Sequence, residues 1–493
     1  MRERPVTVKC MPVLRQFHRA NSRASRIFLL TVSSILTCIG VIFFIATVVY
    51  HVPPMMAPQQ MVRSIATPIL SKVYQSDLEQ ISQLTSRYWI GPPAADIRRA
   101  AVDWNKLAAS SRGLSDLTNV TGPYPDKSVP FVLESYDTSY ISGFKSAFQL
   151  ESLVASEETE FQALLRIAAW VGEQIQHGTD PVPGGVSTFD PTEIVRLARS
   201  GRKFWCEIAA RTLIHALTAL GWCARIVTAS KSGYIWDHAV TEVWCNQYAS
   251  WILLDPDLHV YYSAGGIPLS AFALCHQGPE LERRGLLQQL SFAPWDTGIG
   301  HQNMLPFYSY VHIDLRTDWR SRRLRIGSPV GGDQSTWWTS RPQIRPILTA
   351  IKNVDSEKEF NWPLDQAQLT NPKLESAGNA YRLSFQLGTY SPCFSRFELS
   401  VDGGAWRSVA GTQLELLLAP GRHQLQARVR TKSGYAGKSS LLSFTLEDLK
   451  ARISEAQTYP HGKPSVSFLC IREPFPQRIA SLAWSLETEY LGL

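Results

Sequence analysis

Three residues in one stretch of the chain, 204–256, have side chains suited to nucleophilic catalysis: Cys206, His238 and Asp255. A thiolate can attack an acyl carbon, an imidazole can carry the proton, and a carboxylate can hold the imidazole in place. Taken singly, each of these residue types is more often structural, and a lone cysteine is usually a small buried apolar residue. Their order within one stretch nevertheless predicts thiol acyl-transfer chemistry, with Cys206 as the nucleophile.

The elements around these residues place them at the ends of helices and strands. Apolar residues recur at three- and four-residue steps over 207–220, which predicts an amphipathic helix. Cys206 therefore lies at a helix start, where free backbone N–H groups and the helix dipole favour a thiolate. Runs rich in β-branched and aromatic residues predict strands downstream, and the same periodicity predicts helices upstream. The strands are expected at 224–228, 238–244 and 251–255, and the helices at 158–176 and from Asp190 onward.

The last two predicted strands bring the histidine to a carboxylate. If they form an antiparallel hairpin around Asn246–Ser250, a centred register puts His238 opposite Asp257. Asp255 then lies two positions away on the same face of the sheet. We therefore expect the Asp255 carboxylate to be within diagonal reach of the His238 imidazole.

This stretch resembles the transglutaminase-like superfamily, a group of papain-like enzymes. The family signature is a cysteine that opens a helix, followed by an ALG-x-x-AR-V run, a histidine with a glutamate after it, and a closing W-x-x-x-D-P. The resemblance also extends upstream of the cysteine. The matching segments are 157–178, 190–206, ALGWCARIV at 219–227, HAVTEVW at 238–244 and WILLDP at 251–256.

The resemblance implies an α+β fold with a papain-like core, in which a helix bundle packs on an antiparallel sheet. Carried over residue by residue, it makes Cys206 the nucleophile, His238 the general base and acid, and Asp255 the residue that orients His238. Many members carry Gly or Arg where this chain has Trp205, so the backbone N–H of Cys206 is the one oxyanion donor that we name. The family includes cross-linking enzymes, proteases and glycopeptide amidases, which implies a protein or peptide substrate, envelope glycopeptides included.

The N-terminal segment has the pattern of a signal anchor. Seven basic residues and one acid within 1–26 precede an uncharged run at 27–50. That run is long enough to cross a bilayer as a helix and too long for a typical signal peptide. The basic flank predicts a cytoplasmic N-terminus and an extracytoplasmic large domain, periplasmic or extracellular. A buried core helix is the alternative, but a helix that is apolar on all sides has no obvious soluble partner here. Together with the resemblance, this suggests a membrane-anchored member of bacterial type.

The rest of the chain reads as further domains around the catalytic core. Alternating and apolar runs between Gly- and Pro-containing turns predict a β-sandwich of immunoglobulin or fibronectin-III type near the C-terminus. The expected organisation is a basic segment at 1–26, a transmembrane helix at 27–50, a linker and accessory region at 51–150, the catalytic core at 151–275, an aromatic-rich extension at 276–343, the sandwich at 344–447 and a tail at 448–493.

The cysteines suggest one disulfide in an oxidising compartment. A hairpin centred near Gly233 and Tyr234 pairs Cys223 with Trp244 or Cys245. We predict a cross-strand disulfide between Cys223 and Cys245. The alternative is a pair of buried free thiols, because a shift of one residue would turn Cys245 to the opposite face of the sheet.

Composition narrows the remaining possibilities. A net charge of +7 over 493 residues, without a clustered basic face, does not indicate nucleic-acid binding. The chain has no Gly-rich phosphate loop or dinucleotide fingerprint, and no Cys or His spacing that resembles a zinc site. No cofactor or metal is therefore expected, although some family members use calcium. The alternative to an enzyme is a catalytically idle, surface-anchored scaffold that binds envelope polymer or a partner protein.

Overall fold

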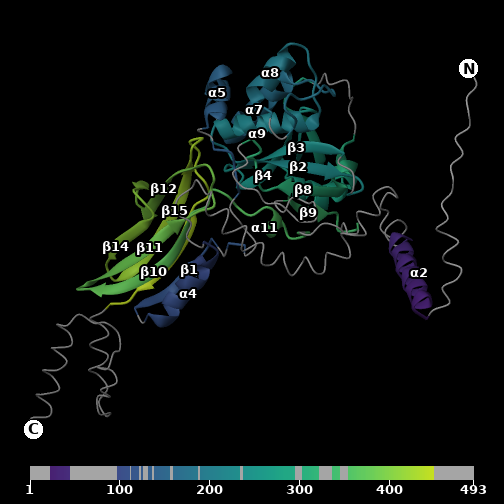
Figure 1. Ribbon diagram of the computed structural model, residues 1–493. Helices are drawn as coiled ribbons and strands as arrows, with labels where there is room; N and C mark the ends of the chain where they lie inside the picture. The colour runs from purple at the N-terminus through teal and green to yellow at the C-terminus, as the bar shows by residue number, and fades with distance from the viewer. Residues whose placement is uncertain are drawn as a thin grey trace, which may run out of the picture. The chain divides into compact units, whose positions relative to one another are not determined.

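The computed structural model describes two parts of the chain, which fall into separate units. It describes residues 23–44 and 97–448, with gaps at 112, 122–123, 126–130, 136–137, 156–158, 187–188, 234–236, 295–302, 321–335 and 345–352. Helix α2 (Arg23–Phe44) belongs to the first unit, and every other described element belongs to the second (Figure 1). Within the described residues, no helix is long and apolar enough to cross a membrane. The predicted transmembrane helix at 27–50 is therefore not shown, and its last six residues lie outside the described part, as does nearly all of the predicted tail.

Helices cover one face of the catalytic core. Two of them begin at the expected signals: Thr159 and Gln162 form a capping box, and the Asp190 side chain accepts a hydrogen bond from the Thr192 N–H. Figure 1 shows the helices gathered along one side of the sheet strands. The helices on this face are α5 (Ser139–Ala147), α6 (Leu150–Val154), α7 (Glu160–Gln174), α8 (Pro191–Arg199) and α9 (Cys206–Ala219).

The sheet of the core has eight strands and is antiparallel throughout, in the order β6-β5-β4-β3-β2-β8-β9, with β7 pairing to β5. The three strands predicted after the catalytic cysteine are β2, β3 and β4. The aromatic-rich extension supplies β7, β8 and β9. The bounds are β2 (Ala224–Ser230), β3 (His238–Cys245), β4 (Ser250–Asp255), β5 (Val260–Ala264), β6 (Ile267–Pro268), β7 (Leu287–Ser291), β8 (Tyr310–Asp314) and β9 (Thr336–Ser340).

Both faces of this sheet are buried. Val243 and Ile252 pack into the core formed with the helices α5 to α9. Their neighbours Trp244 and Trp251 point the other way, into a core shared with α10 (Ala271–Arg283), η4 (Leu305–Ser309) and α11 (Glu357–Phe360). Burial on both sides explains why these strands are apolar runs and do not alternate cleanly. The predicted α+β core of helices on an antiparallel sheet is confirmed.

One ion pair is buried completely in the second of these cores. Arg225 on β2 lies directly across from Glu242 on β3, with 2.6 Å between their charged atoms, and both side chains are 0% exposed. The Arg225 guanidinium also donates to the Phe360 carbonyl at 3.2 Å and lies 3.9 Å from the centroid of the Trp251 ring. Glu242 accepts a 2.6 Å hydrogen bond from the N–H of Ala271, where α10 begins. The pair thus joins the sheet to two neighbouring elements.

The C-terminal region folds as two sheets around one apolar core. One sheet has the order β10-β11-β14, and the other contains β16-β15-β12-β13. Residues of both sheets, such as Leu383, Phe397, Leu425 and Phe444, belong to a single buried cluster. This division of seven strands fits the predicted sandwich of immunoglobulin or fibronectin type. The strands are β10 (Gln368–Ala377), β11 (Ala380–Gly388), β12 (Phe394–Val401), β13 (Arg407–Val409), β14 (Gln413–Leu418), β15 (Gly421–Thr431) and β16 (Ser440–Leu446).

A segment from before the catalytic core completes this sandwich. Strand β1 (Leu114–Asn119) pairs with β16. Helix α4 (Ala100–Ser110), which follows the short 3₁₀-helix η3 (Ile97–Arg99), packs beside β10. The indole N–H of Trp104 on α4 donates to the Leu369 carbonyl at 2.9 Å. Part of the region expected to be an accessory domain is therefore an edge of the sandwich.

The predicted disulfide between Cys223 and Cys245 is wrong. Both residues are free thiols. The register of β2 and β3 pairs Ala224 with Val243, and the N–H of Trp244 donates to the Cys223 carbonyl at 2.9 Å. Cys223 is therefore opposite Trp244, and Cys245 lies one residue further along, on the other face of the sheet. The alternative of two buried free thiols is the one that holds.

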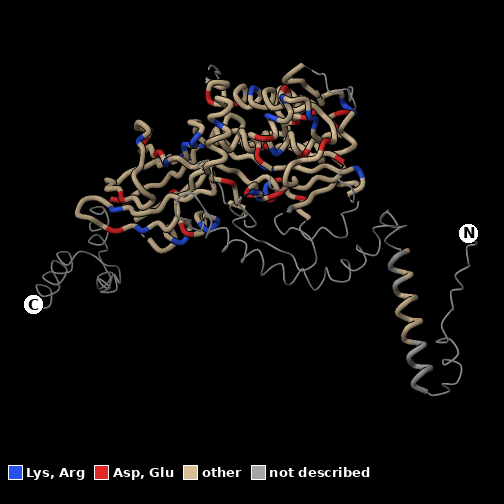
Figure 2. The backbone as a smooth tube through the Cα atoms, turned by 45° about the horizontal axis from the view of Figure 1, so that its top comes forward, with Lys and Arg blue, Asp and Glu red and all other residues tan. Residues whose placement is uncertain are grey.

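Charged residues are spread through the second unit. Figure 2 shows lysines and arginines interspersed with acidic residues along both the catalytic core and the sandwich. This distribution agrees with the modest net charge of +7 for the whole chain.

Candidate active site

Cys206 is the first residue of α9, as the sequence predicts. The residue before it, Trp205, has an extended backbone and makes no side-chain cap hydrogen bond. The thiol is half-buried. Glu207 in the first turn would oppose a thiolate, but it forms a salt bridge of 2.8 Å with Arg211 one turn later. The only acid in the first turn of α9 is therefore paired with a positive charge, which leaves the effect of the helix dipole on the thiol largely unopposed within that turn.

His238 and Asp255 form the predicted pair. His238 Nε2 lies 2.6 Å from Asp255 Oδ2, and both residues are buried. The other carboxylate oxygen of Asp255 accepts hydrogen bonds from the N–H groups of Asp257 and Leu258 at 3.1 and 3.0 Å. Strands β3 and β4 pair Thr241 with Leu254, so the predicted register is confirmed. The backbone of the β4–β5 turn holds the carboxylate that orients the imidazole.

The pKa of His238 depends on both of its neighbours, Asp255 and Cys206. Burial by itself would lower the pKa of His238, but the Asp255 carboxylate and hydrogen bonds to Asp255 and Cys206 raise it well above its ordinary value. Because Nε2 faces Asp255, Nδ1 is the ring nitrogen left for the thiol. Phe307 packs edge-on against the ring, with 6.4 Å between centroids. This arrangement favours a positively charged imidazole ring beside the thiol.

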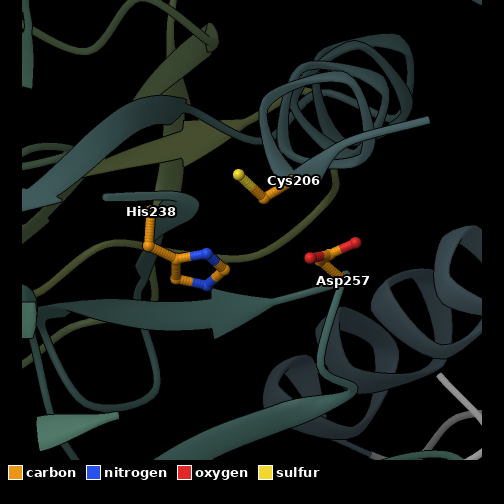
Figure 3. Close-up of side chains that lie close together, drawn as sticks. All are labelled: Cys206, His238 and Asp257. Carbon is orange, nitrogen blue, oxygen red and sulfur yellow. The ribbon is translucent and has the colours of Figure 1, made fainter. Parts of the chain in front are cut away.

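A second carboxylate, Asp257, lies beside the thiol and the imidazole. Cys206 Sγ, a ring nitrogen of His238 and a carboxylate oxygen of Asp257 all lie within 4.8 Å of one another, and Figure 3 shows the three side chains facing a common space. Asp257 is 1% exposed and is held by His177, whose Nδ1 lies 2.9 Å from Oδ2. This hydrogen bond raises the pKa of His177 above its ordinary value, against the effect of its partial burial.

Asp257 and His177 are not among the site residues predicted from the sequence. The signal for Asp257 was present, because the predicted register already placed it opposite His238. His177 lies in the loop after α7, where a parallel bridge to Phe204 brings it close to the start of α9. Nothing in the local sequence indicates this contact.

Cys206 is expected to be the most reactive thiol of the described large unit. Burial is the main cause that raises the pKa of each of the four other thiols there, to about 12 for Cys275. Limiting iodoacetamide near neutral pH should modify Cys206 first, because only this thiol combines partial exposure with an imidazole partner. The others should react only after unfolding. They are Cys223, Cys245, Cys275 and Cys393.

Peptide mapping by mass spectrometry measures this order of labelling. The protein to use carries serine at positions 10, 38 and 470, so that only thiols of the described unit compete. Cys206→Ser in the same background is the control and should remove the native-state adduct. Preferential labelling of any other thiol would contradict an activated Cys206 and favour the scaffold interpretation.

One of three comparisons with known proteins gives a family for the segment that contains the site. Residues 149–256 match the family model of the transglutaminase-like superfamily. A search of curated proteins gives no match. Among solved structures, the crystal structure of a transglutaminase from red sea bream matches at 10% identity with a TM-score of 0.20. That match covers 62% of this chain and 57% of the fish chain, and so little more than half of that relative.

The match to the family model includes every residue of the Cys206, His238 and Asp255 group, and it ends just after β4. The fish structure adds no weight at such a low TM-score, so the assignment follows from the matched residues and from their geometry. Residues 149–256 of this chain form a domain of the transglutaminase-like superfamily.

Proposed function

We propose that the protein is a cysteine enzyme that transfers or hydrolyses acyl groups of protein or peptide substrates through a thioester. The observation that carries the proposal is the 2.6 Å contact between His238 and Asp255, with the Cys206 sulfur at a helix start and within 4.8 Å of a nitrogen of the same imidazole. A fold of this family suggests a cysteine-based acyltransferase or hydrolase. The three residues have the geometry that such chemistry requires.

The reaction proceeds in two steps. The Cys206 thiolate attacks the carbonyl carbon of a carboxamide or peptide bond, a C–S bond forms, and His238 gives its proton to the leaving nitrogen as the C–N bond breaks. In the second step, His238 takes a proton from water or from an amine, which attacks the thioester and releases Cys206. Asp255 keeps the ring oriented and stabilises its positive charge throughout. Water yields hydrolysis, and an amine yields a new amide.

Trapping the acyl-enzyme tests the proposal. The purified protein is incubated with glutamine-containing peptides and with envelope glycopeptides, quenched in acid and examined by intact and peptide mass spectrometry. The expected result is an acyl adduct on Cys206 that hydroxylamine removes, with release of ammonia or of an amine fragment. Cys206→Ser is the matched control. Turnover by the Cys206→Ser protein at the wild-type rate would contradict a thioester mechanism. Binding of envelope polymer without turnover would favour the alternative of a non-catalytic scaffold.

We also propose, on the sequence alone, that the N-terminal segment anchors the chain in a membrane. The support is the uncharged run at 27–50 behind a basic flank at 1–26. The full-length chain should stay in the membrane pellet after alkaline carbonate extraction, whereas a chain that begins at residue 51 should remain in the supernatant. External protease should reach the large domain only from the extracytoplasmic side. Release of the full-length chain by carbonate would rule the anchor out.

A further inference from the structure

Cys206 and His238, which act in the proposed acyl transfer, also form a set of metal-ligand types together with Asp257, which has no role in that reaction. Their sulfur, nitrogen and oxygen atoms lie within 4.8 Å of one another. A tetrahedral zinc ion binds such atoms at about 2.3 Å for sulfur and about 2.0–2.2 Å for nitrogen and oxygen, which separates ligand atoms by roughly 3.5 Å. The three side chains therefore need only small rotations to close around one ion. Figure 3 shows them converging from the start of α9, the start of β3 and the turn after β4.

Each of the two buried ligands already has the outer partner that a zinc ligand usually has. The imidazole of His238 is bound through Nε2 to Asp255, which directs Nδ1 to the thiol and raises the basicity of the ring. The carboxylate of Asp257 is bound to Nδ1 of His177 through both oxygens, at 2.9 and 3.1 Å. Such partners fix ligand orientation before the metal arrives, which lowers the cost of binding.

The chemistry of the ligands selects the kind of cation. A thiolate and an imidazole favour zinc and similar borderline or soft ions, whereas calcium and magnesium prefer sites made only of oxygen. Asp257 and Asp255 together with a Cys206 thiolate supply negative charge within a mostly buried space. Cys206 is half-buried, so an ion can enter from solvent and keep a water molecule as its fourth ligand.

We propose that Cys206, His238 and Asp257 bind a zinc ion reversibly, and that the bound ion blocks the nucleophile. The sulfur lone pair that would attack a carbonyl is donated to the metal, and Nδ1 of His238 is no longer able to carry a proton. Asp257 is the third ligand, whereas Asp255 stays on the outer side of the imidazole. Zinc binding requires only these three side chains and no substrate, so it can be tested separately from the proposed acyl transfer.

Zinc affinity of the full-length protein tests the site directly, by competition with a chromophoric chelator. The wild-type chain should bind one zinc ion, and Cys206→Ala should abolish that binding. Asp257→Asn should weaken it by at least about 100-fold, and His177→Gln by about 10- to 100-fold. Glu173→Gln removes an exposed carboxylate on α7, one turn before His177, and is the matched control that should bind zinc like the wild type.

A second measurement covers the case in which Asp257→Asn fails to fold. X-ray absorption of the wild-type chain loaded with one equivalent of zinc should show one sulfur neighbour, with the remaining neighbours nitrogen or oxygen. A shell without sulfur would overturn the proposal, as would unchanged affinity in folded Cys206→Ala or Asp257→Asn protein. Because neither experiment measures turnover, a failure of the metal site and a failure of the acyl-transfer proposal give different results.

Discussion

Replacing either Cys206 or His238 with alanine is expected to lower turnover by about 10⁴- to 10⁶-fold, the range in which removal of a nucleophile or its base falls in comparable enzymes. Without Cys206 no thioester forms. Without His238 the thiol loses the partner that shares its proton, and the leaving amine has no proton donor. The double variant should be no slower than the worse single variant, because the two residues act as one unit.

Asp255→Asn should behave differently. An amide can still hold the His238 ring, but it cannot stabilise the imidazolium, so a residual rate should remain after a loss of about 10⁴-fold. Steady-state rates on the substrate identified by acyl-enzyme trapping measure all three effects. Cys275→Ser alters a buried thiol outside the site and should keep the wild-type rate. Full activity in folded Cys206→Ala protein would exclude the mechanism.

Arg225→Met is expected to lower the free energy of unfolding by about 3–5 kcal/mol, the largest stability effect that we predict. The substitution leaves Glu242 charged and fully buried without its partner, and it also removes the donor to the Phe360 carbonyl. Glu242→Leu should be similarly costly, because it strands the guanidinium and the N–H of Ala271. Urea denaturation followed by the fluorescence of the buried tryptophans measures both losses.

The double variant separates the ion pair from its other contacts. If the cost of each single change is mainly an unpaired buried charge, Arg225→Met combined with Glu242→Leu should lose much less than the sum of the single losses. Losses that add to within about 0.5 kcal/mol would show that the two charges are not coupled. Arg430→Met in the sandwich removes a partly exposed arginine from a shared carboxylate and is the control for a weaker pair.

The candidate site was predictable because its geometry is local. Cys206 needed only the start of one amphipathic helix, and the His238–Asp255 contact needed only a short hairpin whose turn allows a single centred register. A centred register applied in the same way to β2 and β3 predicted the Cys223–Cys245 disulfide, which the structure does not contain. The connection between β2 and β3 is longer, and an error of one residue in its register moves Cys245 to the opposite face of the sheet.

Contacts between distant segments could not be predicted in this way. His177 and Asp257 are 80 residues apart, and Arg225 and Asn361 are 136 apart, yet each pair shares a hydrogen bond. No periodicity or turn signal links such residues, since their meeting depends on how whole elements pack. The aromatic-rich extension is a milder case. Its strand β8 lies between β2 and β9, and this place in the catalytic sheet depends on pairing with β2, which lies several elements earlier in the chain.

Strands β1 and β16 pair with each other although they lie near opposite ends of the described large unit, so β1 is synthesised well before its partner. Leu114 leaves the ribosome long before its partner Leu446, and the whole catalytic domain emerges between them. Elements whose contacts are close in sequence, such as α9 and the β3–β4 hairpin, can form before β16 has been synthesised and while β1 has no partner strand. A chain interrupted before residue 440 would leave the edges of both β1 and β15 open to other strands. Once β16 has been translated, it pairs with both β1 and β15 and so covers these two edges.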